Sequence, residues 1–256
     1  MKGEAPVLRH PTIEKLQALK LAAMARELGA QRALPEINTL AFEERLGLLA
    51  DCELTERDNR RLASRLRVAK LREAAALEDL DTRAPRSLDK ALIMKLATCQ
   101  WIAEHLNCLI SGPTGIGKTW MACALAHKAA REGYSVLYAR LPKLFSALDL
   151  GRADGRYPKL IKPLAKAELL VLDDLAMAPM SDAHRRDLLE IIDERYKRRS
   201  TIVTSQLPVK QWHSGIGEPT IADAILDRLV HNAYRIAMSG KSMRDTEKLT
   251  QTQTTK

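Results

Sequence analysis

The chain has 256 residues, 46% hydrophobic and 29% charged, which is the balance of a soluble globular protein and excludes a disordered one. No apolar run reaches the roughly 18 residues that a membrane helix needs, and the first residues lack a signal peptide's apolar core, so we expect neither membrane insertion nor secretion. The 41 Lys and Arg residues exceed the 32 Asp and Glu residues by nine, which favours a polyanionic partner. The four cysteines lack C-x-x-C spacing, so neither a zinc site nor disulfides are expected and a cytoplasmic location is favoured.

Residues 1–85 are predicted to form a helical N-terminal domain. Apolar residues at helical spacing indicate a first helix that Thr12 caps and Gly29 ends. A second helix is expected from near Leu40 and a third from Thr55, which begins a variant of the capping box. The third helix is expected to carry a basic face separate from its apolar face, made of Arg61, Arg65 and Arg72.

Residues 86–256 are predicted to form a second domain of α/β class, with Ala84-Pro85-Arg86 as the hinge that leads into it. Helical stretches alternate with short apolar runs of the strand type, at residues 106–110, 135–138, 169–172 and 201–204. This alternation is typical of a mostly parallel sheet flanked by helices.

One segment of the second domain fits the pattern G-x-x-x-x-G-K-[ST], and it follows a predicted strand and opens a helix, the context that a P-loop requires. Its glycines let successive backbone N–H groups point into one concavity, where a phosphate binds. Lys118 is expected to reach the outer phosphates of ATP, and the Thr119 hydroxyl to hold Mg2+. The residues expected to bind the nucleotide are therefore Gly112, Pro113, Thr114, Gly115, Ile116, Gly117, Lys118 and Thr119.

The apolar run at 169–172 ends in Asp173 and Asp174, which places two carboxylates at the strand edge where nucleotides bind. We expect Asp173 to hold the magnesium and Asp174 to polarise the attacking water. Another strand, at 201–204, ends in the polar side chains of Thr204, Ser205 and Gln206, one of which can touch the terminal phosphate or the attacking water; a strand end satisfied by solvent is the alternative. Late in the chain, Arg228 lies on a predicted helix, where an arginine offered to a neighbouring subunit and a surface salt bridge are both compatible with the spacing.

These motifs, together with residues 185–190 and 224–233, resemble the IstB-like transposition ATPases. These AAA+ helper proteins are encoded beside the transposase of certain bacterial insertion sequences and are related to the helicase loader DnaC and the initiator DnaA. The resemblance covers nearly the whole chain. It implies an AAA+ P-loop NTPase domain over residues 86–256, preceded by a helical domain that binds DNA or mediates oligomerisation.

The resemblance also implies roles for individual residues. Arg228 matches the arginine finger that is given to the ATP of the neighbouring subunit, and Ser205 or Gln206 matches sensor I, which acts in catalysis. Arg244 matches a C-terminal arginine of the family that senses phosphate. Extra helices of the initiator and loader branch are expected at about residues 141–166, and the basic residues there that we expect to bind DNA are Lys143, Arg152, Arg156, Lys159 and Lys162.

The function expected from this resemblance is that of a magnesium-dependent, DNA-stimulated ATPase. It is expected to oligomerise on duplex target DNA with ATP, deliver that DNA to the cognate transposase and stimulate the transposase. A DnaC-like replicative helicase loader has the same fold and ATP chemistry, so it is the alternative. A small-molecule P-loop kinase and a DNA-bound scaffold that does not hydrolyse ATP are further alternatives, which measured turnover and phosphorylation of added metabolites would separate.

Overall fold

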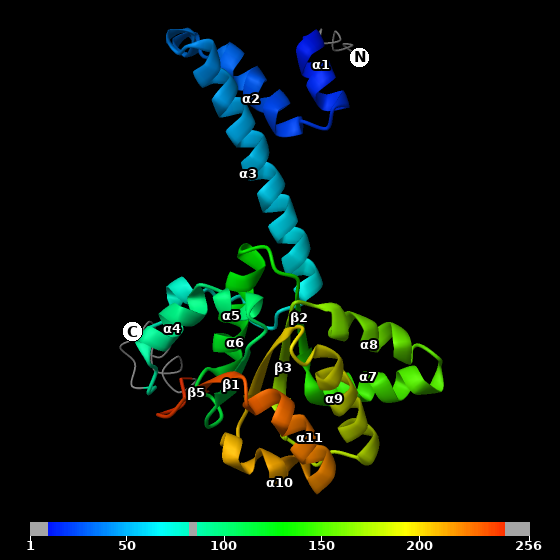
Figure 1. Cartoon of the computed structure of the whole chain (residues 1–256). Helices are drawn as coiled ribbons and strands as arrows, with labels where there is room; N and C mark the ends of the chain where they lie inside the picture. Colours follow the sequence, from blue (N-terminus) through cyan, green and yellow to red (C-terminus); the bar gives the residue numbers. More distant parts are fainter. Residues whose placement is uncertain (1–9, 82–85, 244–256) are drawn as a thin grey trace, which may run out of the picture. The chain divides into compact units, whose positions relative to one another are not determined.

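The computed structural model describes residues 10–81 and 86–243, and the chain divides into two compact units, Met1–Ser64 and Arg65–Lys256 (Figure 1). The division falls inside a helix, whereas the domain boundary that the sequence suggests at 85/86 stays a prediction. The expected hinge, apart from Arg86, lies outside the described residues, and so does Arg244. None of the described helices is long and apolar enough to cross a membrane.

The first unit begins with two separate helices, α1 (Pro11–Ala18) and α2 (Ala22–Ala33). The expectation of one helix from Thr12 to Gly29 is wrong, because Lys20 adopts a left-handed conformation between the two, with a φ of 60°. His10, not Thr12, caps α1, and Gly29 lies inside α2. A short 3-10 helix, η1 (Pro35–Thr39), leads into the next helix.

The long helix α3 (Phe42–Ala69) replaces the two helices expected from Leu40 and Thr55. No glycine or proline interrupts residues 48–69, so the helix continues through Thr55 and the expected start there is wrong. It ends at Ala69, and Lys70 is left-handed with a φ of 52°. Arg72 therefore lies beyond the helix, and the expectation that it shares a helical face with Arg61 and Arg65 is wrong as well.

The described part of the first unit packs around small side chains. Ala23 and Ala25 of α2 and Leu49 of α3 are buried. The Glu53 carboxylate of α3 is also buried, and it accepts hydrogen bonds from the backbone N–H groups of Ala23, at 2.9 Å, and Met24, at 3.3 Å. One side chain of α3 thus satisfies the first amide groups of α2, which the helix itself leaves without partners.

The described residues of the second unit form a five-stranded sheet in the order β2-β3-β4-β1-β5, in which all neighbouring strands are parallel. The strands are β1 (Asn107–Ser111), β2 (Val136–Arg140), β3 (Leu169–Leu175), β4 (Ser200–Ser205) and β5 (Ala233–Ala237). The first four coincide with the strands expected from the sequence. The edge strand β5 was not foreseen, because its alternating pattern in Ala-Tyr-Arg-Ile-Ala has none of the apolar continuity of the central strands.

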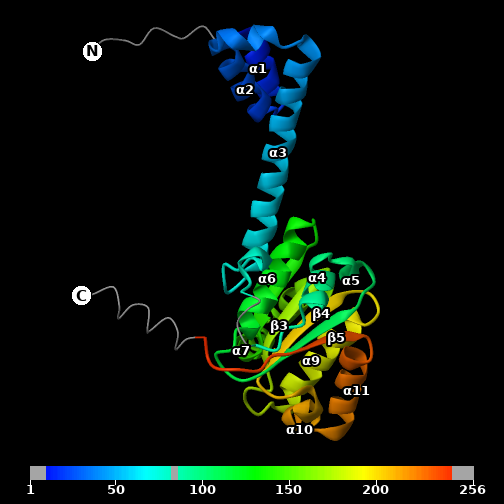
Figure 2. The ribbon, with the colours of Figure 1, turned by 90° about the vertical axis from the view of Figure 1, so that its left-hand side faces the viewer.

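Helices cover the sheet. One cluster of buried residues joins Leu109 of β1, Leu172 of β3 and Val203 of β4 to α7 (Leu141–Ala153), α8 (Tyr157–Lys166), α9 (Asp182–Arg195) and α11 (Pro219–Val230). α9 and α11 lie side by side in Figure 1, and α10 (Trp212–Ile216) packs against α11 (Figure 2). The P-loop helix α6 (Lys118–Arg131) also contacts the sheet and is in turn contacted by α4 (Lys90–Ala97). The remaining short helices are η2 (Leu77–Asp79), α5 (Gln100–Ala103) and η3 (Val209–Gln211).

Candidate nucleotide-binding site

The loop from Gly112 to Gly117 connects β1 to α6 and has the backbone shape of an anion site. Gly115 and Gly117 have φ angles of 81° and 99°, in the left-handed region that other residues rarely adopt. A Cβ atom on Gly112 would collide with the carbonyl oxygen of Met238, the residue that follows β5. Gly117 caps the N-terminus of α6, so the free N–H groups of that helix face the loop.

Lys118 is the first residue of α6, and its side chain turns back over the loop. It is 7% exposed, and its Nζ donates a hydrogen bond to the carbonyl oxygen of Pro113 at 2.8 Å. Lys118 and Thr119 border a cavity of about 640 Å3. The cavity is lined by Arg72, Glu73, Asp79, Asp81, Arg86, Thr114, Gly115, Gly117, Lys118, Thr119, Trp120, Arg140, Asp174, Met177, Gln206 and Met243.

Asp173 is the centre of a network of hydroxyl groups below this cavity. Its carboxylate is fully buried and accepts hydrogen bonds from Thr119 Oγ1 at 3.0 Å and from Thr204 Oγ1 at 2.5 Å. The Tyr138 hydroxyl donates to its other oxygen at 2.6 Å. Burial and this contact with Asp173 raise the pKa of Tyr138, so its hydroxyl keeps its proton as the donor. The network holds the carboxylate against the P-loop threonine, as expected for an acid that shares a cation with it.

Asp174 points away from Asp173 because β3 carries one extra residue there. Leu172 pairs with Val203 and Leu175 with Ser205, so Asp173 and Asp174 together face Thr204 in a β-bulge. Asp174 has a φ of 67°, a strained conformation for a residue with a Cβ atom, and its N–H donates to Thr204 Oγ1 at 3.0 Å. Its carboxylate lines the cavity and accepts a hydrogen bond from Arg140 Nε at 2.6 Å.

Ser205 and Gln206 occupy different surroundings. Ser205 is fully buried, and its hydroxyl donates to the Leu175 carbonyl at 2.8 Å and accepts from the N–H of Leu207. Among the described residues, those that line the cavity include Gln206 but not Ser205. Thr114 Oγ1 donates to Gln206 Oε1 at 2.8 Å, which brings the end of β4 into contact with the P-loop.

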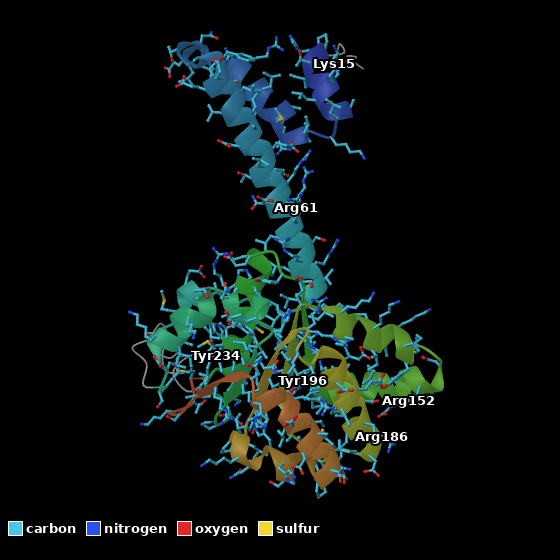
Figure 3. All side chains as sticks on the ribbon, in the orientation of Figure 1. Lys15, Arg61, Arg152, Arg186, Tyr196 and Tyr234 are labelled. Carbon is cyan, nitrogen blue, oxygen red and sulfur yellow. The ribbon has the colours of Figure 1, made fainter. Side chains whose placement is uncertain are left out.

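Arg228 lies on α11, on a different part of the second unit, and is not among the described residues that line the cavity. Its Nε donates to Asp193 of α9 at 2.6 Å, and its guanidinium lies 5.8 Å from the ring centre of Tyr196, which Figure 3 labels. The side chain is 28% exposed. The structure thus shows a surface salt bridge between Arg228 and Asp193. Part of the Arg228 guanidinium remains accessible to solvent.

The basic residues expected to bind DNA differ in whether they already contact other protein groups. Arg61 extends from α3 and Arg152 lies on α7 (Figure 3), but Arg152 pairs with Asp187, which is buried. Arg156 pairs with Asp154 at 2.5 Å, and Arg65 Nε donates to the carbonyl of Ala130 on α6. Arg72 lines the nucleotide cavity. Among the insert residues expected to bind DNA, those for which no ion pair is described within residues 10–81 and 86–243 are Lys143, Lys159 and Lys162, all of them exposed.

The sequence did not assign Arg72, Tyr138 or Arg140 to the nucleotide site, and it offered Thr204 only as one of three side chains that can touch the phosphate or the water. Tyr138 and Arg140 come from the end of β2, beside β3 in the sheet. Tyr138 and Arg140 alternate with apolar residues at the carboxyl end of the strand. This pattern could have indicated the site, because polar residues at that end of a parallel sheet face the ligand. No local pattern pointed to Arg72, since its place depends on how the segment after α3 packs.

A loop of this shape after the first strand, an acid pair at the end of β3 and a parallel sheet in this order define a P-loop ATPase of the AAA+ class. Solved structures agree on the fold. The chain resembles DnaI with a TM-score of 0.57 and 24% identity, over 64% of this chain and 91% of that one. It resembles a replication initiator DnaA bound to AMPPCP and single-stranded DNA with a TM-score of 0.55 and 17% identity, over 71% and 56%.

The family model described as IstB-like ATP binding protein matches residues 14–251, so the chain belongs to the IstB-like ATP-binding protein family. It is 53% identical to the insertion sequence ATP-binding protein y4pL of Sinorhizobium fredii, over 93% of this chain and 97% of that protein. It is 48% identical to the ATP-binding protein of insertion sequence IS1162 from Pseudomonas fluorescens, over 81% and 90%. The resemblance and the α/β P-loop fold expected from the sequence are both confirmed.

Proposed function

We propose that the chain is a magnesium-dependent ATPase of the cytoplasm that assembles on duplex DNA with ATP and delivers the DNA to the transposase of an insertion sequence. The proposal rests on Lys118 and Thr119 in the cavity wall, with the buried Asp173 hydrogen-bonded to Thr119 behind them, in a chain whose relatives are named as insertion sequence ATP-binding proteins. ATP binding follows from the family, while the metal, the DNA and the transposase are the proposed parts.

The residues around Asp173 suit magnesium. This metal prefers oxygen ligands and is often held by one carboxylate and a P-loop hydroxyl beside the phosphates. Thr119 Oγ1 and Asp173 Oδ1, 3.0 Å apart, supply such a pair, and we assign the metal to them. Magnesium, when bound, neutralises charge that develops on the transferred phosphoryl group. Lys118 binds the outer phosphates, and the backbone N–H groups of residues 114–119 donate hydrogen bonds to the remaining phosphate oxygens.

Asp174 is the proposed base that orients the attacking water, because its carboxylate faces the cavity. Gln206 supports the sensor role better than Ser205, whose hydroxyl ties β4 to β3. Arg228 is proposed to act on the ATP of a neighbouring subunit, leaving Asp193 when subunits assemble. The assignment of Arg244 rests on resemblance alone.

DNA is the partner that the charge of the chain favours, and the exposed lysines of the insert support a phosphate-binding surface there. The alternative of a helicase loader draws on the likeness to DnaI and DnaA, but at under 25% identity that likeness describes the fold. The relatives at 48% and 53% identity carry insertion sequence names, which favours transposition.

The test of the proposed function is the rate of ATP hydrolysis with and without duplex DNA. We expect magnesium-dependent turnover that rises several-fold when a duplex is added, and that disappears in Lys118→Ala. In parallel, labelled ATP is offered with nucleosides and small metabolites. Transfer of phosphate to any of these would contradict the proposal in favour of a kinase, and ATP binding without turnover would favour a scaffold.

A further inference from the structure

The segment that follows α3 is packed against the P-loop helix. Leu71, Ala75 and Leu77 belong to one small apolar cluster with Cys123 and Ala124 of α6, which Trp120 and Tyr138 complete. Arg65, in the last turns of α3, donates a hydrogen bond to the carbonyl of Ala130 near the other end of α6. Residues 65–77 therefore contact α6 through the Arg65 hydrogen bond and through this apolar cluster. Arg72 belongs to the same stretch.

Arg72 projects from this segment to the nucleotide cavity. It lines the cavity together with Lys118 and Thr119, and its Nη1 lies 3.9 Å from Oδ2 of Asp173. Tyr138 also interacts with Arg72. Because the Tyr138 hydroxyl donates its hydrogen bond to Asp173, its oxygen serves as an acceptor for the guanidinium. The guanidinium thus lies next to the carboxylate assigned to magnesium, on the side of the cavity where the outer phosphates belong.

Each of the other cations of the cavity donates a hydrogen bond to a carboxylate or carbonyl oxygen of the protein. Arg140 Nε donates to Asp174 at 2.6 Å, Arg86 Nη2 to the carbonyl of Asp81 at 2.6 Å, and Lys118 Nζ to the carbonyl of Pro113 at 2.8 Å. Arg72 has ion-pair distances of 3.6 Å to Glu73 and 3.9 Å to Asp173, both longer than a hydrogen bond. A phosphate oxygen at that place would be a better acceptor, because the planar guanidinium can bind two phosphate oxygens at once.

We propose that Arg72 is a phosphate-binding residue of its own subunit, which donates hydrogen bonds to the terminal phosphate of the ATP held by the P-loop. The segment after α3 thereby contributes to the nucleotide site in cis, whereas Arg228 is offered to a neighbour. The inference rests on the proposed magnesium–ATP site. Arg72 is then a nucleotide-binding residue and not one of the arginines that bind DNA.

The test measures the dissociation constants of a non-hydrolysable ATP analogue and of ADP, with magnesium and without DNA. Arg72→Ala is compared with Arg67→Ala, which removes an exposed arginine near the end of α3 that is not among the described cavity-lining residues. We expect Arg72→Ala to weaken ATP-analogue binding about tenfold or more, the effect of losing a charge-assisted hydrogen bond, and to change ADP binding far less. Arg67→Ala should match the wild type for both.

Unchanged ATP-analogue affinity in Arg72→Ala, or an equal loss for the ATP analogue and ADP, would overturn the inference. The melting temperature of the nucleotide-free protein is measured alongside. A lower melting temperature with an unchanged ratio of the two affinities would assign Arg72 to neutralising Asp173 instead. Arg72→Gln, which keeps the length of the side chain, repeats the measurement if the alanine variant does not fold. Failure of the wild type itself to bind ATP would contradict the proposed function, so the two failures are distinguishable.

Discussion

Asp173 and Asp174 are adjacent in sequence but have different partners. Asp173 is buried among the hydroxyl groups of Thr119, Thr204 and Tyr138, which suits a carboxylate that must stay in place as a metal ligand. The Asp174 carboxylate is partly exposed in the cavity and accepts a hydrogen bond from Arg140. The extra residue of β3 produces this difference, since it turns the second carboxylate out of the sheet.

Replacing Asp174 by Asn should leave ATP affinity close to that of the wild type and slow hydrolysis by about 100-fold, the usual contribution of a general base. The amide keeps the shape of the side chain and cannot accept a proton. Single-turnover hydrolysis and equilibrium binding of ATP separate the two effects. Asp182→Asn, an exposed acid at the start of α9, is the matched control. Wild-type turnover in Asp174→Asn would mean that Asp174 has a structural role in the β-bulge and does not act as the base in hydrolysis.

At the scale of elements, the strands of the sheet core and the P-loop could be predicted from the sequence because short-range patterns encode them. Leu169–Leu172 is a continuous apolar run, and the loop 112–119 carries its glycines at fixed spacing. The bulge in β3 and the place of Arg72 could not be predicted, because each depends on packing between distant segments, whereas the continuous helix α3 was not predicted because a local capping pattern indicates a helix start. Thr55 illustrates this: its capping pattern is real, but the helical residues before it continue the helix through it.

The Glu53 carboxylate should stabilise the start of α2 in a pH-dependent way. Burial opposes its ionisation, but hydrogen bonds from Arg57, Met24 and Ala23 outweigh burial and lower the pKa of Glu53 below its ordinary value of 4.5. A lowered folded-state pKa means that its stabilisation is present above about pH 4.5 and is lost as the pH falls through the folded pKa.

Glu53→Gln should therefore speed amide hydrogen exchange at Ala23 and Met24 near neutral pH, and the difference from the wild type should shrink toward pH 4. Asp58→Asn, an exposed residue of the same helix whose pair with Arg61 is fully at the surface, is the control and should change exchange at Ala23 little. If the two variants exchange alike at every pH, Glu53 does not cap α2.

The two helices of the insert should carry phosphate contacts through Lys143, Lys159 and Lys162. Changing all three to Gln should reduce the slope of log affinity against log salt by about two to three units, close to 0.9 per lost contact. Arg152 is left unchanged, because removing it would leave the buried carboxylate of Asp187 without its ion pair. A control triple variant of exposed lysines outside both the insert and the N-terminal domain, Lys90, Lys95 and Lys210, should keep the slope. An unchanged slope in the insert variant would move the DNA surface elsewhere.

At the scale of the whole molecule, hydrolysis should need more than one subunit. Arg228→Ala and Lys118→Ala proteins, each inactive alone, should partly recover hydrolysis when mixed with ATP and DNA, because some junctions then pair an intact P-loop with an intact arginine. Asp193→Asn removes the intramolecular partner of Arg228 and should stay active. Absence of recovery in proven mixed assemblies, together with an inactive Asp193→Asn, would show that the salt bridge within the subunit is what matters.

ATP bound at this P-loop should drive assembly on duplex DNA, and sedimentation velocity with a labelled duplex measures that assembly. With magnesium and a non-hydrolysable ATP analogue, the duplex should sediment in a complex of several protein chains, and with ADP it should not. Lys118→Ala should prevent the complex, because the phosphates lose their buried ammonium, whereas Lys128→Ala at the far end of α6 should form it. Complexes of equal size with the ATP analogue, with ADP and with Lys118→Ala would contradict the account.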